Sequence, residues 1–496
     1  MVQSIVIVGG GSAGWITANL LNAHCQRAGR KTQITLVESP DIPTIGVGEA
    51  TVPTIRRTLN DIGLPERDLL VSAEATFKTL IRFQNWNAEE SYDHPFDRRR
   101  RPLTDDAVSR WTAQNNLPFD RSFSALTQLA DDNVAPKSPR QAQYQGSFPY
   151  AYHLDAVKLA NRLASFGRER GIQHRLCNVT DVTVSPEGLI SAVNTDHGDA
   201  LAADLYIDCT GFRSALLGGA LGVKMRSFAK YLLCDRAVTM RIPYDVHKPE
   251  RLLTYTLATA RDAGWQWDIN LQNRRGIGYV YSSAFLNEDA AEAALRQHEG
   301  RHCDQLEARH IRFTSGKRQV SWKGNCVAVG LSDGFLEPLE SSGLYLIEFA
   351  GLAIATMLDD FAAAPQATAR YYNRISDELY DEILGFLNLH YVISTRRDTP
   401  FWKAATADEA ILDDLRDRLE LWKRRSPTQF DFPGADRLFA QDSYEFILHG
   451  MKYVDGPVSG APGVPDLSAL VGKSRAELPE QEALLALVQR ASAVQA

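Results

Sequence analysis

The chain has 496 residues, which is enough for two or three domains with large buried cores. Its hydrophobic content of 44% and charged content of 23% are typical of a globular protein and exclude collagen-like and disordered classes. The net charge of −7 excludes a broadly basic surface, so we expect no nucleic-acid partner.

Cysteine spacing and hydrophobic runs predict where the protein resides. The six cysteines form neither CxxC pairs nor a metal-ligand spacing, so we expect free thiols, a reducing compartment and no metal site. The apolar stretch Ile5–Val8 is too short for a signal peptide, and no run of about 20 apolar residues predicts a membrane span. Together these features favour a cytoplasmic protein without membrane contacts.

The N-terminal segment has the order of a dinucleotide-binding unit. An apolar strand over Ser4–Val8 is followed by Gly9–Gly14, which fits the pattern G-x-G-x-x-G. A helix over Trp15–Arg27 and a second strand over Gln33–Val37 follow, and the latter ends at the acidic Glu38. Glycines in this context predict a site for the pyrophosphate of a dinucleotide at the helix N-terminus.

Each residue of this turn has a separate physical role. Gly9 permits the tight turn, Gly11 lets the backbone approach the pyrophosphate, and Gly14 lets the helix pack closely on the strand. Glu38 can accept hydrogen bonds from a ribose, and its charge disfavours a 2′-phosphate. The cofactor is therefore predicted to be FAD or NAD rather than NADP.

Two later strands also end in glycine and favour FAD over NAD. They cover Asp204–Gly211 and Asn325–Leu331, and the glycine-rich segment Ile45–Thr51 adds a further place where backbone can approach a long cofactor. We expect the three glycine-terminated strands to return to one parallel sheet, as in two-domain FAD enzymes. The predicted cofactor-binding residues are Gly9, Gly11, Ser12, Ala13, Gly14, Glu38, Ala50 and Leu331.

The middle of the chain predicts strands of a second domain. Thr76–Phe83 alternates as one strand, with Lys78 and Arg82 on one face; by itself, the pattern makes Lys78 a solvated lysine. His94 and Phe96 follow in a turn over His94–Asp97, where they either project to one side of a pocket or only hold the loop together. Antiparallel strands are expected over Arg236–Ser283; within them Trp265 and Trp267 point the same way, which in isolation favours a core wall.

The stretch Glu337–Gly343 places two carboxylates between a buried strand and a long apolar helix over Leu344–Leu358. By itself it predicts a helix start, where Ser and Gly form the turn and the N-terminus attracts anions. Mainly helical segments follow, over Ala364–Leu389, Ala407–Arg424 and Glu480–Ala493.

Several segments, in order along most of the chain, resemble the flavin-dependent tryptophan halogenase family. Trp265–Asn270 is similar to the family's W-x-W-x-I-P, with Asn270 where proline is expected. The other segments that carry the resemblance are Gly9–Trp15, Phe77–Lys78, Tyr150–Ala156, Asp208–Ser214 and Leu336–Gly343.

The resemblance implies an α/β fold of the FAD-binding Rossmann-like, glutathione-reductase type. The implied FAD-binding domain covers residues 1–350, with inserted β-sheet and substrate segments at about 60–150 and 225–315. A mainly helical substrate-binding module covers residues 351–496.

The implied activity is halogenation of an electron-rich, indole- or tryptophan-like aromatic. Reduced FAD, dioxygen and chloride or bromide give hypohalous acid, which Lys78 receives by hydrogen bonding or covalent trapping. Glu340 is the implied partner carboxylate that stabilises the cationic ring and takes its proton. Ser342 and Gly343 resemble the halide site.

The remaining implied roles concern the substrate and the partners. His94 and Phe96 would line the aromatic pocket, and Trp265 with Trp267 would form a barrier between flavin and substrate. Because no nicotinamide site is visible, a separate flavin reductase is expected to supply reduced FAD. The alternatives that remain open are an FAD-dependent aromatic monooxygenase and a flavin-binding protein without turnover; the oligomeric state is open too, a homodimer included.

Overall fold

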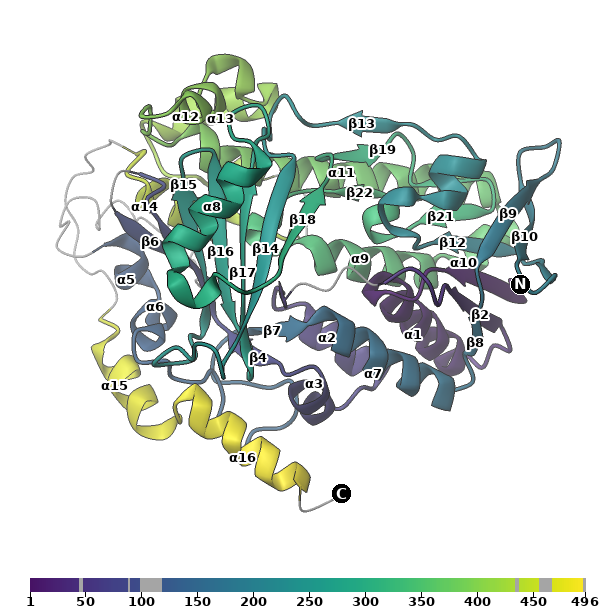
Figure 1. The fold of residues 1–496 in the computed structure, drawn as a ribbon, viewed down its shortest axis with the longest axis horizontal. Coiled ribbons are helices and arrows are strands. Elements are labelled where there is room, and N and C mark those ends of the chain that lie inside the picture. The colour runs from purple at the N-terminus through teal and green to yellow at the C-terminus, as the bar shows by residue number, and fades with distance from the viewer. Residues whose placement is uncertain (44–47, 88–89, 99–117, 433–436, 455–465, 494–496) are drawn as a thin grey trace. The chain divides into compact units, whose positions relative to one another are not determined.

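The computed structural model of the protein describes all residues except 44–47, 88–89, 99–117, 433–436, 455–465 and 494–496 (Figure 1). The chain forms two compact units, each assembled from three stretches of sequence. Unit 1 comprises Met1–Ala75, Leu154–Phe228 and Phe313–Asp381, and unit 2 comprises Thr76–His153, Ala229–Arg312 and Glu382–Ala496.

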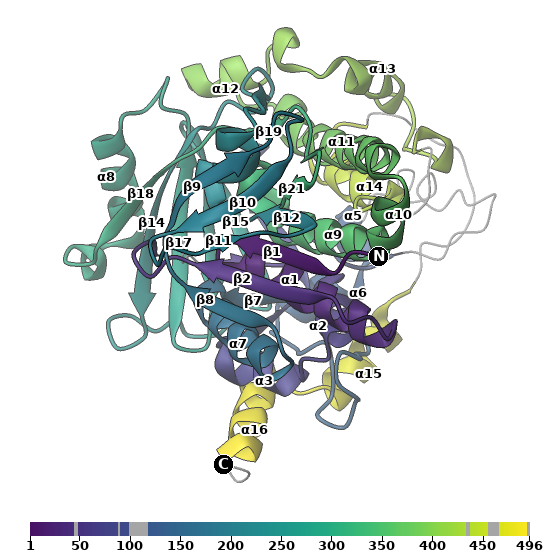
Figure 2. The ribbon, with the colours of Figure 1, turned by 90° about the vertical axis from the view of Figure 1, so that its right-hand side faces the viewer.

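Unit 1 is built on a six-stranded sheet in the order β20-β21-β12-β1-β2-β8. Figure 2 shows its strands β12, β1, β2 and β8 side by side. The bounds of the six strands are β1 Ser4–Val8, β2 Gln33–Glu38, β8 Gln173–Leu176, β12 Leu205–Asp208, β20 Trp322–Lys323 and β21 Cys326–Ala328. Strands β1, β12 and β21 pair in parallel, so the three glycine-terminated strands do return to one sheet, as predicted.

Helices and smaller sheets complete unit 1. Helix α1 packs against α7 and α9, and α2 contacts both α1 and α9. The close packing of α1 and α9 is visible at Gly351, where a Cβ would lie 2.8 Å from Leu20 Cδ1. The remaining elements of unit 1 are α1 Ser12–Arg27, β3 Gly48–Ala50, α2 Ile55–Ile62, α3 Glu66–Ser72, α7 Ala156–Glu169, β9 Val179–Val184, β10 Ile190–Thr195, β11 Ala200–Leu201, β13 Met225–Ser227, β19 Gly316–Arg318, β22 Gly334–Phe335, α9 Gly343–Thr356 and α10 Leu358–Ala363.

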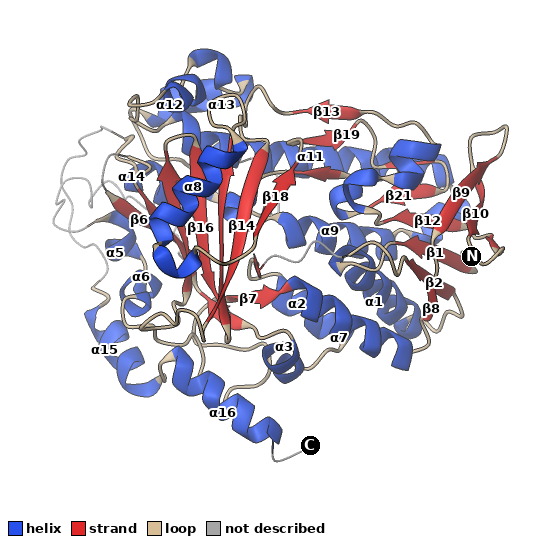
Figure 3. Ribbon diagram, viewed as in Figure 1, coloured by secondary structure: helices blue, strands red, loops and turns tan. Residues whose placement is uncertain are grey.

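Unit 2 is built on a seven-stranded sheet in the order β18-β14-β17-β16-β15-β5-β6, drawn in red in Figure 3. Strands β14, β17, β16 and β15 are antiparallel, which confirms the prediction for the region Arg236–Ser283. The bounds of the seven strands are β5 Leu80–Gln84, β6 Ser91–Pro95, β14 Arg236–Pro243, β15 Tyr255–Arg261, β16 Gly264–Asn270, β17 Arg274–Tyr281 and β18 Ala308–Arg312.

The prediction of one strand over Thr76–Phe83 is wrong. The chain changes hydrogen-bonding partners at Thr79, so that β4 (Thr76–Lys78) pairs with β7 (Ala151–Asp155), whereas β5 pairs with β15 and β6. The Thr79 N–H donates to Thr254 O at 2.7 Å, and its carbonyl accepts from Phe96 N–H at 3.1 Å. A period-2 pattern does not show such a change of partner, because alternation continues through it.

The remaining elements are helices, most of them in the C-terminal region. The predicted helices over Ala364–Leu389 and Glu480–Ala493 are confirmed, whereas the one over Ala407–Arg424 is wrong at its start, because an α-helix begins only at Asp413. The helix bounds are α5 Phe119–Phe123, α6 Ala125–Ala130, α8 Glu288–Glu299, α11 Pro365–Val392, α12 Pro400–Ala405, α13 Asp413–Trp422, α14 Gln441–Gly450, α15 Ser468–Glu477 and α16 Gln481–Ala493.

The predicted α/β class with a Rossmann-like sheet is confirmed by these elements. All six cysteines are buried free thiols, also as expected. Over the part of the chain that the structure describes, no helix has the length and apolar character to cross a membrane.

Candidate active site

The glycine turn between β1 and α1 is closely packed against its neighbours. Gly9 has a φ of +117°, and a Cβ there would lie 2.1 Å from the carbonyl oxygen of Cys209. A Cβ on Gly14 would lie 1.9 Å from the Gly9 carbonyl oxygen, so the helix approaches the turn as closely as backbone allows. Any larger residue would move the turn or the helix, which is the packing that a dinucleotide-binding turn needs.

The first turn of α1 fits a bound pyrophosphate. Its N-cap, Gly11, provides no capping side chain, and the first turn carries no acidic residue that would repel an anion. The Ser12 hydroxyl donates to Ala156 O at 3.2 Å and so fixes α7 to this end of α1. A Cβ on Gly330 would lie 3.0 Å from Ala13 Cβ, which places the segment of Gly330 and Leu331 beside α1.

Glu38, the predicted ribose ligand, lies at the C-terminal end of β2. Its carboxylate contacts the backbone of Gly10, since a Cβ there would lie 2.1 Å from Glu38 Cδ. His174 Nε2 lies 2.8 Å from Glu38 Oε2, and the His174 ring packs edge-on against Trp15. This histidine orients the carboxylate, a contribution that the sequence did not indicate. Ala50 is half-buried at the end of β3, while residues 45–47 of the same predicted segment lie outside the described residues.

The stretch Glu337–Gly343 forms a 3₁₀ turn over Pro338–Glu340 followed directly by α9. Glu340 is 2% exposed, and Ser341 has a φ of +59°, which turns the chain sharply into the helix. Ser342 is the N-cap of α9, and its buried hydroxyl oxygen has no hydrogen-bond partner. Gly343 is exposed, and a Cβ there would contact nothing within 4 Å. This helix N-terminus therefore has the donors and the open space that a halide needs.

One buried acid of α9 was missed by the sequence. Glu348 is buried, and its Oε2 accepts a hydrogen bond from the Thr58 hydroxyl of α2 at 2.6 Å. The Thr54 hydroxyl also bonds this carboxyl, while Oε1 has no partner. Burial raises the pKa of Glu348 to about 8, so the group is protonated at neutral pH. The only sign of Glu348 in the sequence is a single acidic residue within the apolar helix that follows Gly343.

In unit 2, Lys78 is completely buried at the end of β4, with an exposed fraction of 0%. The expectation of a solvated lysine is therefore wrong. Its Nζ lies 5.1 Å from the centroid of the Phe96 ring, close enough for a cation–π interaction. Lys78 and Phe96 are thus brought together.

A buried histidine shares the face of β4 that carries Lys78. His153 lies opposite Thr76 in the pair of β4 and β7, with Nδ1 3.4 Å from Thr76 Oγ1 and Nε2 2.8 Å from Thr256 Oγ1. The Thr76 hydroxyl donates its own proton to Asn270 O at 2.6 Å, so it can only accept from His153. Nδ1 therefore carries the proton and Nε2 accepts from Thr256. Burial and, second, the Lys78 charge hold the pKa of His153 well below its ordinary value, so the ring stays neutral.

The two other predicted pocket residues have aromatic neighbours. His94 lies within β6, so the prediction of a turn is wrong at its start. The buried His94 ring has its centroid 5.6 Å from that of Phe386 and 6.4 Å from that of Phe439. Phe386 and Phe439 are themselves stacked at 4.0 Å. This arrangement supplies flat apolar surfaces beside His94, as a site for a planar ring requires.

The two tryptophans predicted as a barrier lie on one face of β16. Their ring centroids are 6.2 Å apart; Trp265 is buried and Trp267 is half-buried. Trp267 covers Gly278 on the neighbouring strand, where a Cβ would lie 2.1 Å from the indole ring. The glycine therefore makes room for the ring to lie flat on the sheet.

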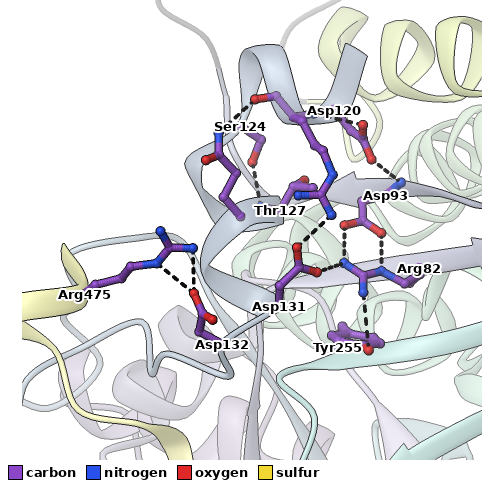
Figure 4. Close-up of polar contacts among 11 residues, drawn as sticks. Arg82, Asp93, Asp120, Ser124, Thr127, Asp131, Asp132, Tyr255 and Arg475 are labelled. Carbon is purple, nitrogen blue, oxygen red and sulfur yellow. Dashed lines mark hydrogen bonds and ion pairs between the residues drawn. The ribbon is translucent and has the colours of Figure 1, made fainter. Parts of the chain in front are cut away.

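Arg82, which the pattern had placed on the same face as Lys78, belongs to a separate ion-pair network (Figure 4). Its guanidinium bonds both oxygens of Asp93, at 2.7 and 2.9 Å, and one oxygen of Asp131 at 2.9 Å. Asp120 accepts from Asp93 N–H at 2.9 Å, and burial followed by the Asp93 charge raises its pKa to about 6. This network joins β5 and β6 to α5 and to the end of α6, so Arg82 has a packing role.

The predicted site residues thus divide between the two units. Unit 1 contains the turn of Gly9–Gly14, Glu38, Ala50, Leu331 and the turn of Glu340, Ser342 and Gly343. Unit 2 contains Lys78, His94, Phe96, Trp265 and Trp267. Each unit therefore holds a coherent part of the chemistry that the resemblance implied.

Comparison with known proteins decides the family. The family profile described as Tryptophan halogenase matches residues 4–461. The chain belongs to the tryptophan halogenase family. The enzyme is accordingly a flavin-dependent halogenase, and the family uses FAD and halide.

Individual relatives agree over nearly the whole length. The halogenase is 39% identical to tryptophan 6-halogenase SttH of Streptomyces toxytricini, over 86% of this chain and 84% of SttH. It is 38% identical to 7-chloro-L-tryptophan 6-halogenase KtzR of Kutzneria sp., over 94% of this chain and 93% of KtzR. The crystal structure of a tryptophan halogenase from Shewanella frigidimarina is 34% identical and superimposes with a TM-score of 0.91, covering 99% and 98% of the two chains.

The raised pKa of Glu348 predicts a pH-dependent stability of the halogenase. The folded protein keeps a proton on Glu348 up to about pH 8, whereas the unfolded chain loses it near the ordinary value of 4.5. The contribution of Glu348 to the free energy of unfolding is therefore fully present below pH 4.5 and is lost as pH rises to about 8, by on the order of a few kcal/mol. We expect Glu348→Gln to remove this loss, so that the variant exceeds the parent in stability increasingly from pH 5 to 8.

Chemical denaturation at several pH values measures the effect. The half-buried Glu49 and the buried Asp120 and Asp333 have pKa values raised to about 6 to 7, so the difference in stability between parent and variant is the relevant quantity. A constant difference across this range would show that Glu348 is ionised in the folded protein at neutral pH.

Proposed function

We propose that the protein halogenates an electron-rich aromatic substrate of the indole or tryptophan type, using FADH2, dioxygen and chloride or bromide. The observation that carries this proposal is the complete burial of Lys78 beside the Phe96 ring. Burying a lysine ammonium opposes folding, and ionisable groups that are buried in this way cluster at functional sites.

Unit 1 would hold the cofactor. The turn of Gly9–Gly14 and the N-terminus of α1 would receive the pyrophosphate, and Glu38 would accept from the ribose. When bound, reduced FAD would supply two electrons that reduce dioxygen to the peroxide level, and this oxidant would convert halide to hypohalous acid. The N–H groups of Ser342 and Gly343 at the start of α9 would bind the halide.

Lys78 and Glu340 would act on the halogen transfer itself. The Lys78 ammonium donates a hydrogen bond to the oxygen of hypohalous acid; as the oxygen–halogen bond breaks and the carbon–halogen bond forms, Lys78 protonates that oxygen, which leaves as water. The carboxylate of Glu340 would stabilise the cationic ring and take the ring proton, and Lys78 would regain its own proton from water. A neutral Lys78 amine that forms a covalent haloamine is the other form of the same role.

The relatives favour tryptophan or a related indole as the substrate, because SttH and KtzR are named for tryptophan and chlorotryptophan. The aromatic surfaces around His94 and Phe96 fit a planar ring of this kind. An aromatic monooxygenase is the alternative, since it needs the same glycine turn but neither Lys78 nor the halide turn.

A reconstituted assay tests this proposal. Purified protein receives FAD, a flavin reductase, NADH and bromide or chloride, and mass spectrometry compares halogenated and hydroxylated products over a panel of indoles and phenols. We expect Lys78→Ala and Glu340→Gln to lower halogenation by about 10²-fold or more, because each removes a proton-transfer group.

Each variant has a matched control. Lys137 is another buried lysine of unit 2 that lies over a tyrosine ring, and Glu337 is a buried carboxylate of the same turn as Glu340. Lys137→Met and Glu337→Gln should keep most of the activity. Halogenation at the parent rate by Lys78→Ala would refute its role, and hydroxylation by the parent would favour the monooxygenase.

We expect the two tryptophans to keep the substrate from reacting at the flavin directly. Removing their bulk in Trp265→Ala and Trp267→Ala should lower halogenation and produce some hydroxylated product, which mass spectrometry detects in the same assay. Trp402→Phe, a change at a buried tryptophan of α12, is the control. If neither alanine variant changed the products, the barrier role would be wrong.

A separate flavin reductase is expected to supply reduced FAD. The purified protein should therefore oxidise NADH only at background rates, followed by absorbance at 340 nm, until a reductase is added. Rapid NADH oxidation by the protein and FAD alone would contradict this expectation.

A further inference from the structure

A single buried amide connects the C-terminal helix to the strand that carries Lys78. Gln481, the first residue of α16, has an exposed fraction of 0%. Its Oε1 accepts from the Phe77 N–H at 2.7 Å, and its Nε2 donates to Leu252 O at 2.9 Å and Leu253 O at 3.2 Å. Its backbone N–H donates to Asn133 O at 2.9 Å. The amide thus uses both donors and its acceptor within the interior.

These bonds fix the backbone on both sides of Lys78 to the same segment. On the C-terminal side, the Thr79 N–H and hydroxyl both donate to Thr254 O, at 2.7 and 3.0 Å. On the N-terminal side, the Phe77 N–H reaches the neighbouring residues Leu252 and Leu253 only through the Gln481 amide. Gln481 therefore takes the place that another strand would occupy beside β4.

The segment that receives these bonds is itself braced. The Leu253 N–H donates to Asn270 Oδ1 at 2.9 Å, and the Asn270 carbonyl accepts from the Thr76 hydroxyl. Thr76, Phe77 and Thr79 are therefore all held, while the Lys78 side chain itself extends toward Phe96. A strand of three residues has few bonds of its own, so these contacts determine its conformation.

We infer that Gln481 is a positioning residue for Lys78: it fixes the backbone of β4 so that the Lys78 amine is held where hypohalous acid arrives. The inference rests on the proposed role of Lys78. Loss of the amide would leave the buried Phe77 N–H without a partner and let β4 shift. A displacement of about 1 Å at a reacting group can lower a rate by roughly 10²-fold.

The variants Gln481→Ala and Gln481→Met test this inference, the second keeping most of the volume. Leu485→Ala is the matched control, because Leu485 is a buried residue of the same helix and its loss destabilises α16 without removing bonds to β4. Gln489→Ala is a second control, since Gln489 is a glutamine of α16 whose side-chain Nε2 donates to Gln272 Oε1 at the surface.

The first measurement follows the fate of the halogen. We expect both Gln481 variants to give at least about 10-fold less halogenated product per reduced FAD, with an unchanged substrate KM and flavin oxidation rate. The lost oxidant should appear as hypohalous acid trapped by an added thioether. Leu485→Ala should keep the parent yield even if its melting temperature is as low as that of the Gln481 variants. Equal yields of halogenated product in the Gln481 variants and in Leu485→Ala would show that Gln481 has only a structural role.

The second measurement separates this inference from the proposed function. The NMR resonance of the Lys78 ε-carbon, assigned with Lys78→Ala, should shift in Gln481→Met but not in Leu485→Ala or Gln489→Ala. An unchanged resonance refutes the positioning of Lys78, whatever Lys78 does in turnover. If the resonance shifted but Lys78→Ala still halogenated the substrate, the role of Lys78 in turnover would be refuted. The effect of Gln481 on the position of Lys78 would then still hold.

Discussion

Lys78 is buried at the end of a three-residue strand, and its position depends on hydrogen bonds to the residues on either side of it. Because the chain changes partners at Thr79, Lys78 is the last residue of β4 in one sheet, and β5 of another sheet begins at Leu80. The main-chain bonds of Thr79 and the amide of Gln481 then hold both flanking peptides to the segment Leu252–Thr254. The proposed role of Lys78 requires such a fixed position, because its amine must meet a small reactive oxidant.

In unit 1, packing between helices α1 and α9 holds their N-termini in position. Both N-termini have a proposed role in binding an anion. Helix α1 begins at the turn Gly9–Gly14 and α9 begins after the turn Glu337–Ser342, and the two helices pack closely enough that a Cβ on Gly351 would lie 2.8 Å from Leu20 Cδ1. Both N-termini present backbone N–H groups to anions. The uncharged form of Glu348 lets α9 also pack on α2 without burying a net charge, so the position of the turn before α9 depends on an interface in which Thr58 is hydrogen-bonded to Glu348.

The sequence predicted the parallel sheet of unit 1, because glycine turns and apolar strands are local features. It also predicted the paired orientation of Trp265 and Trp267, which follows from the period of a strand. It did not predict the burial of Lys78, since the alternation of Thr76–Phe83 fits a single strand and only the distant partners of Thr79 show the break. His174 and Gln481 were missed for a related reason: each acts through contacts with residues more than 100 positions away, which no local pattern contains.

The residue at position 270 shows how the family motif can change without losing this arrangement. The Thr76 hydroxyl bonds the main-chain carbonyl of residue 270, a group that proline and asparagine both possess, so the contact to β4 does not depend on the side chain. Asparagine adds an acceptor, Oδ1, which receives the Leu253 N–H, a bond that proline cannot make. Asn270 therefore adds a side-chain bond to the segment to which Gln481 is bonded.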